Sequence, residues 1–443
     1  MKVEEVGKLL QGTFLNETNR SKEIGAIAID SRTMRKNDVF LCLLGKTLDG
    51  HNFIEDALLK KPGLVIVSKK VSIKTKIPIL LVEDTLEAYF RLARYHLDQI
   101  GPSVVAVTGS VGKTTTKELI WKFLRIKYRV CKSEGNHNNH IGVPMTMLKL
   151  KPRDEILLLE MGMNHQGEIE RLSKLATPQI AVITNIGTSH IGYLKSKRNI
   201  FRAKMEITKG MHHGILVLNG EDHYLKRVKE NDNYDVVMVD HHLFPHIVKE
   251  HENTLEIIFR YQKQVYRFFL PRYYAHLKET IWIALEVGVL YHVPMRDMVH
   301  VLNHLSLTLP GRLEKIPFGN HQYLIDDTYN ASYESTKVAL QYLQSFPGEK
   351  CLIFGDILEL GKQSKKIHRK VARLFSKAKG IHYVFIGTEV KVMKKQLKEA
   401  LYFETVEQYI KYLETHPVTE KMVLLKASHN VHLSKLIPIF REM

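Results

Sequence analysis

A glycine-containing loop between an apolar segment and a helical pattern is the feature that most limits how this chain folds. Val104–Val107 are four consecutive apolar residues, which predicts a buried strand, and residues 117–124 have the apolar spacing of a helix. A strand, a glycine loop and a helix together form the arrangement in which backbone N–H groups and a helix N-terminus bind phosphate. The loop consists of Gly109, Ser110, Val111, Gly112, Lys113, Thr114 and Thr115. The sequence therefore predicts an α/β fold with a phosphate-binding loop.

The residue types of this loop suit a nucleotide bound together with Mg²⁺. Its glycines let backbone N–H groups turn inward, Lys113 can reach the terminal phosphates, and Thr114 can place its hydroxyl on the metal ion. The loop departs from the G-x-x-x-x-G-K-[ST] pattern at one position, because Val107 stands where the first glycine belongs. On the loop alone, an ordinary strand-to-helix turn that happens to contain Gly-Lys-Thr is the alternative.

The length of the chain indicates several domains. A chain of 443 residues is too long for one hydrophobic core, and about 150 residues per domain suggests three. We expect them at residues 1–100, 101–310 and 311–443. Lys and Arg exceed Asp and Glu by 65 − 47 = 18, which fits either nucleic acid or an anionic nucleotide substrate. Because the cations are scattered and no RNP-type motif is present, we expect no nucleic acid partner.

The cysteines and the apolar segments bear on where the protein works. Cys42, Cys131 and Cys351 lie far apart without a C-x-x-C pair, which argues against a zinc cluster or a disulfide framework and fits a reducing cytoplasm. No apolar run approaches about 18 residues, so we expect no membrane insertion. We expect a cytoplasmic monomer with small-molecule partners.

Polar side chains follow the apolar segments at the point where each segment ends. Glu160 ends an apolar segment, His190 follows the next one, and Asp327 ends a third. Because the carboxyl ends of parallel strands share one edge of a doubly wound sheet, we expect these side chains at the site, where an acid can hold a metal ion. Lys204 beside Glu206, on a predicted helix, is typical of a solvated helix face. We assign no function to residues 220–275.

Taken together, the motifs resemble those of the Mur ligases. The matching segments, in the same order as in that family, are Thr108–Thr115, Gly135–Pro144, Glu160–Gly162, Thr184–His190, Ala203–Glu206 and Pro310–Arg312. The resemblance implies a smaller N-terminal α/β domain for a UDP-sugar peptide, a central doubly wound and mostly parallel P-loop domain, and a C-terminal Rossmann-like domain for the incoming amine. It also implies an ATP-dependent ligase in which ATP phosphorylates a carboxylate and the amine then displaces phosphate.

The resemblance also implies the roles of individual residues. Lys113 and the Gly109–Thr115 backbone would hold the phosphates of ATP, and Arg312, Asp327, Tyr329 and Asn330 would approach the nucleotide from the last domain. Thr114 and Glu160 would bind one Mg²⁺ and His190 a second, with Lys204 carbamylated as a carboxylate-like ligand. That role replaces the solvated-face interpretation of Lys204. Substrate contacts would come from Ser31, Arg32, Asp49, His51, Lys426 and Ser428.

Four further segments resemble the branch of this family that adds D-alanyl-D-alanine to a UDP-N-acetylmuramoyl tripeptide. They are Asp30–Arg32, Asp49–His51, Asp326–Asn330 and Gly355–Gly361. The chain departs from the usual pattern at Ser332–Ser335, which lacks a proline, at Lys426–His429, where histidine replaces arginine, and at Tyr274–Thr280, which lacks two amides. The alternative is a paralogous ligase that acts on a different carboxylate or amine.

Overall fold

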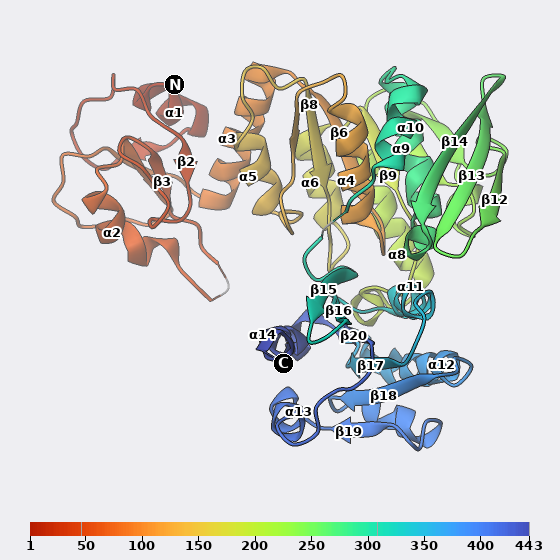
Figure 1. Cartoon of the computed structure of the whole chain (residues 1–443). Coiled ribbons are helices and arrows are strands. Elements are labelled where there is room, and N and C mark those ends of the chain that lie inside the picture. The colour runs from red at the N-terminus through yellow and green to blue at the C-terminus, as the bar shows by residue number, and fades with distance from the viewer. Residues whose placement is uncertain (46, 308, 443) are drawn as a thin grey trace. The chain divides into compact units, whose positions relative to one another are not determined.

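The structure is a computed structural model that describes residues 1–45, 47–307 and 309–442 (Figure 1). Contacts within the chain divide it into two compact units. The first comprises Met1–Val104 and Arg129–Leu159, and the second comprises Val105–Tyr128 and Glu160–Met443.

The first unit contains a five-stranded sheet in the order β1-β5-β4-β3-β2, parallel except for the pair β1–β5. Its strands are β1 (Thr13–Phe14), β2 (Ile27–Ala28), β3 (Val39–Leu41), β4 (Leu64–Val67) and β5 (Ile79–Leu81). Helices α1 (Val3–Leu10), α2 (Ile54–Leu59) and α3 (Thr85–Ile100) supply apolar side chains to two buried clusters. Alternating side chains of β3 and β4 enter the two clusters, as expected of a sheet covered on both faces.

Three more elements belong wholly or mostly to this unit. Strands β7 (Val130–Lys132) and β8 (Ile156–Glu160) pair in parallel, and α5 (Gly142–Leu148) packs against α3. In the turn that precedes α5, the Asn139 side-chain oxygen accepts hydrogen bonds from the backbone N–H groups of Ile141 at 3.0 Å and Gly142 at 2.9 Å. The amide-rich segment predicted around Gly135–Pro144 therefore leads into a helix.

The second unit begins with four parallel strands in the order β11-β10-β9-β6. These are β6 (Ser103–Thr108), β9 (Ile180–Ile183), β10 (Gly214–Asn219) and β11 (Tyr234–Val239). Their connections contain α4 (Lys113–Leu124), α6 (Glu168–Ala176), α7 (Ile191–Leu194), α8 (Lys197–Met205) and the 3-10 helix η2 (Glu206–Gly210). Later in the chain, α9 (Lys278–Leu290) packs against α4 and α10 (Met295–Asn303) packs against α9. β6 and β9 are buried over nearly their whole length, as their continuous apolar sequences predict.

The charged, histidine-rich segment after β11 forms a small antiparallel sheet. Strands β12 (His246–Glu250), β13 (Thr254–Tyr261) and β14 (Gln264–Pro271) pair in sequence order, and β14 packs against α10 (Figure 1). An aromatic cluster joins this sheet to α9, since the Trp282 ring lies 5.4 Å from that of Phe244 and 5.2 Å from that of Phe259. The aromatic residues of this segment thus attach the sheet to the helix.

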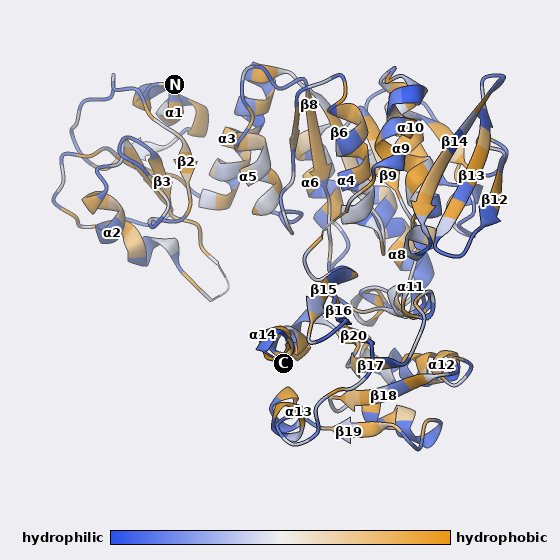
Figure 2. Ribbon diagram, in the orientation of Figure 1, coloured by the Kyte–Doolittle hydropathy of each residue, from blue (hydrophilic) through white to orange (hydrophobic). Residues whose placement is uncertain are grey.

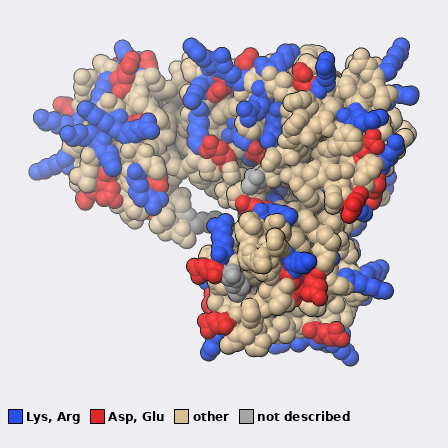
Figure 3. Space-filling view, viewed as in Figure 1, with Lys and Arg blue, Asp and Glu red and all other residues tan. Residues whose placement is uncertain are grey.

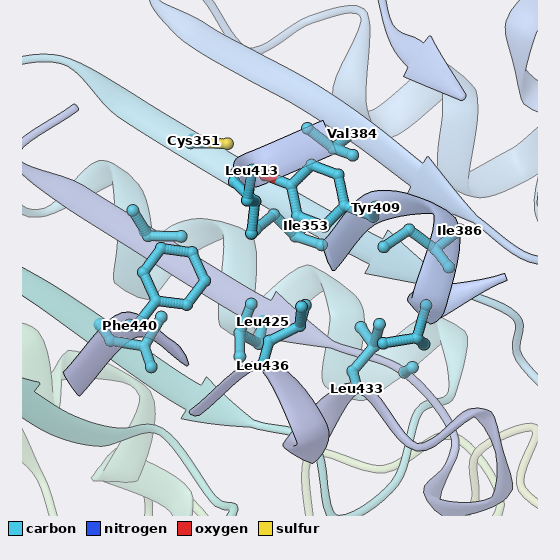
Figure 4. Close-up of a cluster of buried hydrophobic side chains, with 14 of the residues drawn as sticks. Cys351, Ile353, Val384, Ile386, Tyr409, Leu413, Leu425, Leu433, Leu436 and Phe440 are labelled. Carbon is cyan, nitrogen blue, oxygen red and sulfur yellow. The ribbon is translucent and has the colours of Figure 1, made fainter. Parts of the chain in front are cut away.

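The last part of the chain is a six-stranded sheet in the order β15-β16-β20-β17-β18-β19, parallel except for β15. Its elements are β15 (Glu314–Phe318), β16 (Gln322–Asp327), α11 (Tyr333–Gln344), β17 (Lys350–Gly355), α12 (Ser364–Phe375), β18 (Ile381–Ile386), β19 (Leu401–Phe403), α13 (Val406–Leu413), β20 (Met422–Lys426) and α14 (Leu436–Glu442). α13 and α14 cover one face of the sheet, where Leu413, Leu436 and Phe440 meet Ile353 and Leu425 (Figure 4). Figure 2 shows the corresponding contrast between hydrophobic strands and the hydrophilic outer sides of the helices.

These observations confirm the predicted fold class, an α/β protein built on mostly parallel sheets. The domain boundaries near residues 100 and 310 stay predictions. Cys42, Cys131 and Cys351 are free thiols. In the described residues, no helix is both long enough and apolar enough to span a membrane.

Candidate active site

The phosphate-binding loop runs from the end of β6 to the start of α4. Gly109 has φ +155° and Gly112 has φ +82°, and both values belong to the region that favours glycine. At Gly109 a side chain is also excluded by space, because a Cβ there would lie 1.8 Å from Thr184 Oγ1. Gly112 immediately precedes α4, so the backbone N–H groups of the loop are continuous with those at the N-terminus of that helix.

Thr184 and Asn185, which directly follow β9, hold the loop in this conformation. The Thr184 hydroxyl donates a hydrogen bond to the Val111 carbonyl at 2.7 Å. The Asn185 side chain both donates to that carbonyl at 2.8 Å and accepts from the Val111 N–H at 3.0 Å. The loop is therefore fixed by hydrogen bonds from a neighbouring strand end, which limits the reorganisation needed when it binds an anion.

Thr114 and Glu160 meet at the end of the phosphate loop. The Thr114 hydroxyl donates a hydrogen bond to Glu160 Oε2 at 2.8 Å, and Glu160 is 1% exposed. The ammonium of Lys113 donates to the Gly109 carbonyl at 3.0 Å. Burial lowers the pKa of Lys113, partly offset by the charge of Glu160. A hydroxyl and a carboxylate placed together beside a phosphate loop are oxygen ligands of the kind that Mg²⁺ prefers.

Lys204 lies on α8 and is only 2% exposed. Burial lowers its pKa well below the ordinary value for lysine, and the nearby charge of Lys113 lowers it further. The interpretation of Lys204 as part of a solvated helix face is therefore wrong. Its neighbour Glu206 is also buried, where its carboxylate accepts hydrogen bonds from the backbone N–H of Gly167 at 2.8 and 2.9 Å.

His190 faces the segment that follows β17. Its Nδ1 atom lies 2.7 Å from Glu359 Oε2. This contact with the imidazole lowers the pKa of Glu359. The backbone supports the same approach, because the N–H of Gly192 donates to the Glu359 carbonyl at 2.9 Å. His190 thus lies where the loop after β9 meets the loop after β17.

Glu334, at the start of α11, makes a second contact with the loop after β9. Its Oε2 accepts hydrogen bonds from the Thr188 N–H at 3.0 Å and the Thr188 hydroxyl at 2.6 Å. Its Oε1 accepts from the Lys197 ammonium at 3.1 Å. Burial alone would raise the pKa of Glu334, but the bonds from Thr188 and the charge of Lys197 keep it below the ordinary value.

The four residues predicted to approach a nucleotide from the last part of the chain lie in two groups, Arg312 with Tyr329, and Asp327 with Asn330 around Lys426. The Arg312 guanidinium lies 3.8 Å from the centre of the Tyr329 ring, which is the geometry of a cation–π contact. The Lys426 ammonium donates to Asp327 at 2.5 Å and to the Asn330 carbonyl at 3.0 Å. Burial raises the pKa of Asp327, while the charge of Lys426 opposes the shift.

Lys426 and Ser428, predicted as substrate-binding residues, have their main contacts inside the protein. The Lys426 side chain is 1% exposed, and its positive charge forms an ion pair with the carboxylate of Asp327. The Ser428 hydroxyl accepts a hydrogen bond from the Leu358 N–H at 2.9 Å. Ser428 therefore holds the loop that carries Glu359.

The four predicted substrate residues of the first unit fall into two loops. Arg32 is exposed and makes a bidentate contact with Asp30, with bonds of 2.9 and 2.7 Å that lower the pKa of Asp30 to about 2; Ser31 beside it is buried. Asp49 accepts from the His51 N–H at 2.9 Å and lies 2.6 Å from its Nδ1. His51 Nε2 accepts from the Ser68 N–H at 3.0 Å.

Sequence reasoning assigned no role to Thr184, Asn185, Glu334 or Glu359. Thr184 and Asn185 belong to a matched motif, and their position directly after an apolar segment was the available signal. Nothing in the local sequence pairs Glu334 with Thr188, which lies 146 positions away. In the described residues, no group of three or more His, Cys, Asp and Glu side chains is arranged to hold a metal ion.

Comparisons with known proteins place this geometry in context. Three family models match the chain: the Mur ligase family, catalytic domain at residues 23–94, the Mur ligase middle domain at 107–271, and the Mur ligase, glutamate ligase domain at 311–429. A relative from Bacillus subtilis (strain 168), UDP-N-acetylmuramoyl-tripeptide--D-alanyl-D-alanine ligase, is 32% identical and covers 98% of this chain and 97% of its own. The enzyme of that name from Escherichia coli (strain K12) is 28% identical, covering 95% and 94%.

Solved structures agree with these sequence matches. MurF from Acinetobacter baumannii has a TM-score of 0.90 at 29% identity, covering all of this chain and 98% of its own. MurF ligase from Thermotoga maritima in complex with ADP has a TM-score of 0.81 at 29% identity, covering 94% of this chain and 97% of its own.

Proposed function

Because the chain belongs to the Mur ligase family, we propose that it adds D-alanyl-D-alanine to UDP-N-acetylmuramoyl-tripeptide in the synthesis of peptidoglycan precursors. It is an ATP-dependent ligase that forms an amide bond. The likeness in sequence and fold to the D-alanyl-D-alanine-adding ligases carries the proposal, and Thr114 beside Glu160 and the buried Lys204 support it within the site. We place the reaction in the cytoplasm, which the three free thiols support.

The proposed reaction has two steps. In the first, a terminal carboxylate oxygen of the tripeptide attacks the γ-phosphorus of ATP, the bond to the bridging oxygen of ADP breaks, and an acyl phosphate forms. In the second, the amine of D-alanyl-D-alanine attacks the acyl carbon, inorganic phosphate leaves, and the amine loses a proton. The first step brings anions together, so the site has to offset their repulsion.

We propose that the phosphate loop and Lys113 bind the phosphates of ATP and stabilise the charge of the transferring group. Thr114 and Glu160 would hold Mg²⁺, with His190 at a second ion. The hydroxyl and carboxylate oxygens of the first pair fit that ion. When bound, Mg²⁺ supplies positive charge to the phosphate oxygens.

We propose that Lys204 is carbamylated. Only a neutral amine adds to CO₂, and burial favours the neutral form of this lysine. The amine nitrogen forms a bond to carbon and releases one proton, which leaves a carbamate anion on the side chain. A cation is thereby converted into an anionic oxygen group beside Lys113. Burial keeps the amine in its reactive neutral form, and the positive charge of Lys113 would stabilise the carbamate anion that results.

In the last part of the chain, we propose that Arg312 and Tyr329 contact the nucleotide, with Asp327 and Asn330 beside them. Lys426 holds Asp327 and Asn330 in place through its two hydrogen bonds. In the first unit, Ser31 and Arg32 would bind the UDP part of the substrate. Asp49 and His51 would shape the substrate site by fixing the conformation of the loop that contains them.

The proposed function predicts that phosphate release from ATP requires both organic substrates. With UDP-N-acetylmuramoyl-tripeptide present, D-alanyl-D-alanine should stimulate release far more than single amino acids or other dipeptides. Phosphate measured by a colorimetric assay, and the product by mass spectrometry, would check this. Strong stimulation by a different amine would instead identify a paralogous ligase, which the histidine at position 429 leaves as the second candidate.

The contacts of Glu334 predict that its carboxylate is needed for full activity. Hydrogen bonds to a charged group contribute about 2 kcal/mol, so Glu334→Gln should lower kcat/KM by roughly 30-fold. Lys197→Gln removes only the half-exposed partner and should cost less than about threefold. Steady-state phosphate release measures both. Equal activity of Glu334→Gln and the wild type would show that this connection has no part in the reaction.

A further inference from the structure

The segment from Gly361 to Gly380, which contains α12, carries many positive charges and no Asp or Glu. Its cations are Lys362, Lys365, Lys366, Arg369, Lys370, Arg373, Lys377 and Lys379, and all eight are exposed. The apolar face of α12 is occupied, because Ile367, Val371 and Phe375 are buried in the protein. Five of the eight, Lys365, Lys366, Arg369, Lys370 and Arg373, lie on α12, and the other three flank it, so the helix and its ends present cations to solvent. We refer to these eight residues as the α12 basic face.

Carboxylates of the protein neutralise almost none of the positive charge of the α12 basic face. In the part of the chain that the structure describes, none of the eight cations forms an ion pair with a carboxylate, and Lys370 instead lies 3.8 Å from the centre of the Tyr333 ring. The acid next to the start of the helix, Glu389, accepts a hydrogen bond from the Ser364 hydroxyl. Figure 3 shows Lys and Arg side chains gathered where Figure 1 places α12.

The spacing of the cations makes the arrangement costly for the helix itself. Within α12, Lys366 and Lys370 lie four residues apart, and so do Lys365, Arg369 and Arg373. Like charges at this spacing repel one another on a helix surface and destabilise it. Helix stability therefore does not explain the pattern, whereas an external anionic surface would offset the repulsion across the whole face at once.

We propose that the α12 basic face docks on the surface of a bilayer containing anionic phospholipids. Clusters of four to eight Lys and Arg on an amphipathic helix are typical of such binding. Six of the eight cations are lysines, which act as point charges and do not require the bidentate geometry that arginine favours. Since the apolar face of α12 is packed in the core, the contact is electrostatic adsorption without insertion.

Two other anionic partners fit the observations less well. Single-stranded nucleic acid is bound by grooves that combine cations with aromatic side chains for stacking, and residues 361–380 contain a single aromatic, Phe375, which is buried. The substrates of the proposed reaction are also anionic, and Gly361 lies beside Gly192, close to His190. The α12 basic face, however, continues away from that point to Lys379, farther than a substrate contact requires.

The test is co-sedimentation of the full chain with vesicles of phosphatidylcholine, with or without phosphatidylglycerol. We expect binding only to the anionic vesicles, weakening as salt is raised. The variant K366E/R369E/R373E spares Lys370 and keeps good helix formers. At about 1 kcal/mol per cation, it should bind at least about 100-fold more weakly. K70E/K74E/K76E, with the same charge change on an exposed loop of the first unit, should keep most of the binding.

The outcomes separate the proposal from its competitors. Vesicle binding retained by K366E/R369E/R373E would overturn it, as would an equal loss in the control variant, which would indicate net charge alone. A fall in kcat/KM with soluble substrates without a loss of vesicle binding would assign the face to substrate steering and also overturn it. Tighter binding of an RNA oligomer through the same three residues would replace the lipid surface by nucleic acid. If K366E/R369E/R373E fails to fold by circular dichroism, K366Q/R369Q/R373Q answers the same question.

Discussion

Replacing Lys204 by alanine is expected to lower kcat by about 1000-fold or more, because it removes the proposed carbamate, an anionic group beside the phosphate-binding residues. The expectation depends on the burial of this side chain, which lowers the pKa of its amine and so favours the neutral form that adds CO₂. Lys204→Arg should be equally inactive, since a guanidinium stays protonated and forms no carbamate.

The carbamate can be observed independently of activity. With ¹³C-labelled bicarbonate, the wild type should show a carbamate carbon signal in its NMR spectrum that Lys204→Ala lacks. Lys209→Ala, an exposed lysine on η2, is the matched control and should keep both the signal and the activity. Prolonged incubation at low pH, where carbamates decompose, should inactivate the wild type, and bicarbonate should restore it. Full activity in Lys204→Ala would eliminate the proposed role.

Replacing Glu160 by glutamine is expected to lower kcat by about 100-fold to 1000-fold and to raise the Mg²⁺ concentration needed for half-maximal activity. The variant keeps the size of the side chain and a hydrogen-bond acceptor for Thr114, so the change isolates the negative charge. Removing one charge-stabilising group from an enclosed active site typically has an effect of this size. Titration of phosphate release with MgCl₂ measures both quantities.

The matched control for Glu160 is Glu155→Gln, just before the other end of β8, where the carboxylate is exposed and accepts from the Arg129 N–H at 2.9 Å. This variant should show the wild-type Mg²⁺ dependence. If Glu160→Gln had the same kcat and the same Mg²⁺ dependence as the wild type, Glu160 would not be a metal ligand.

The phosphate loop and the parallel strands were predictable because their signals are local. Four apolar residues, two glycines and a helical pattern within some twenty positions specify a strand, a loop and a helix. The polar residues at the ends of apolar segments were predictable for the same reason, since the carboxyl ends of parallel strands share one edge. Glu160 at the end of β8 lies beside Thr114 of the phosphate loop, whereas Asp327 ends a strand of a different sheet, so a common site for these side chains stays a prediction.

The state of Lys204 was not predictable from its neighbours. A lysine near a glutamate on a helix has the same local sequence whether the face is solvated or covered, and the packing of more distant segments decides between the two. The pairing of Lys426 with Asp327 joins residues 99 positions apart. Lys426 therefore holds Asp327 and Asn330, and we propose that it acts on ligands through them, a role that the sequence pattern did not distinguish from direct contact.

The buried face of the small sheet β12–β14 could not be predicted from the sequence, for a different reason. Its strands contain five charged residues and one histidine, and β12 is exposed along most of its length. The signal for burial came from a few aromatic residues, and their partner Trp282 lies on a later helix. Without knowledge of that partner, the alternation of these strands gives no clear indication of which face is covered.

The most direct test of the proposed reaction follows the oxygen atoms of the tripeptide carboxylate. UDP-N-acetylmuramoyl-tripeptide labelled with ¹⁸O at its terminal carboxylate is incubated with ATP, D-alanyl-D-alanine and the enzyme, and the phosphate released is analysed by mass spectrometry. An acyl phosphate transfers one carboxylate oxygen to phosphorus, so we predict one ¹⁸O atom in each phosphate and one in the new amide. Phosphate free of ¹⁸O would contradict the account.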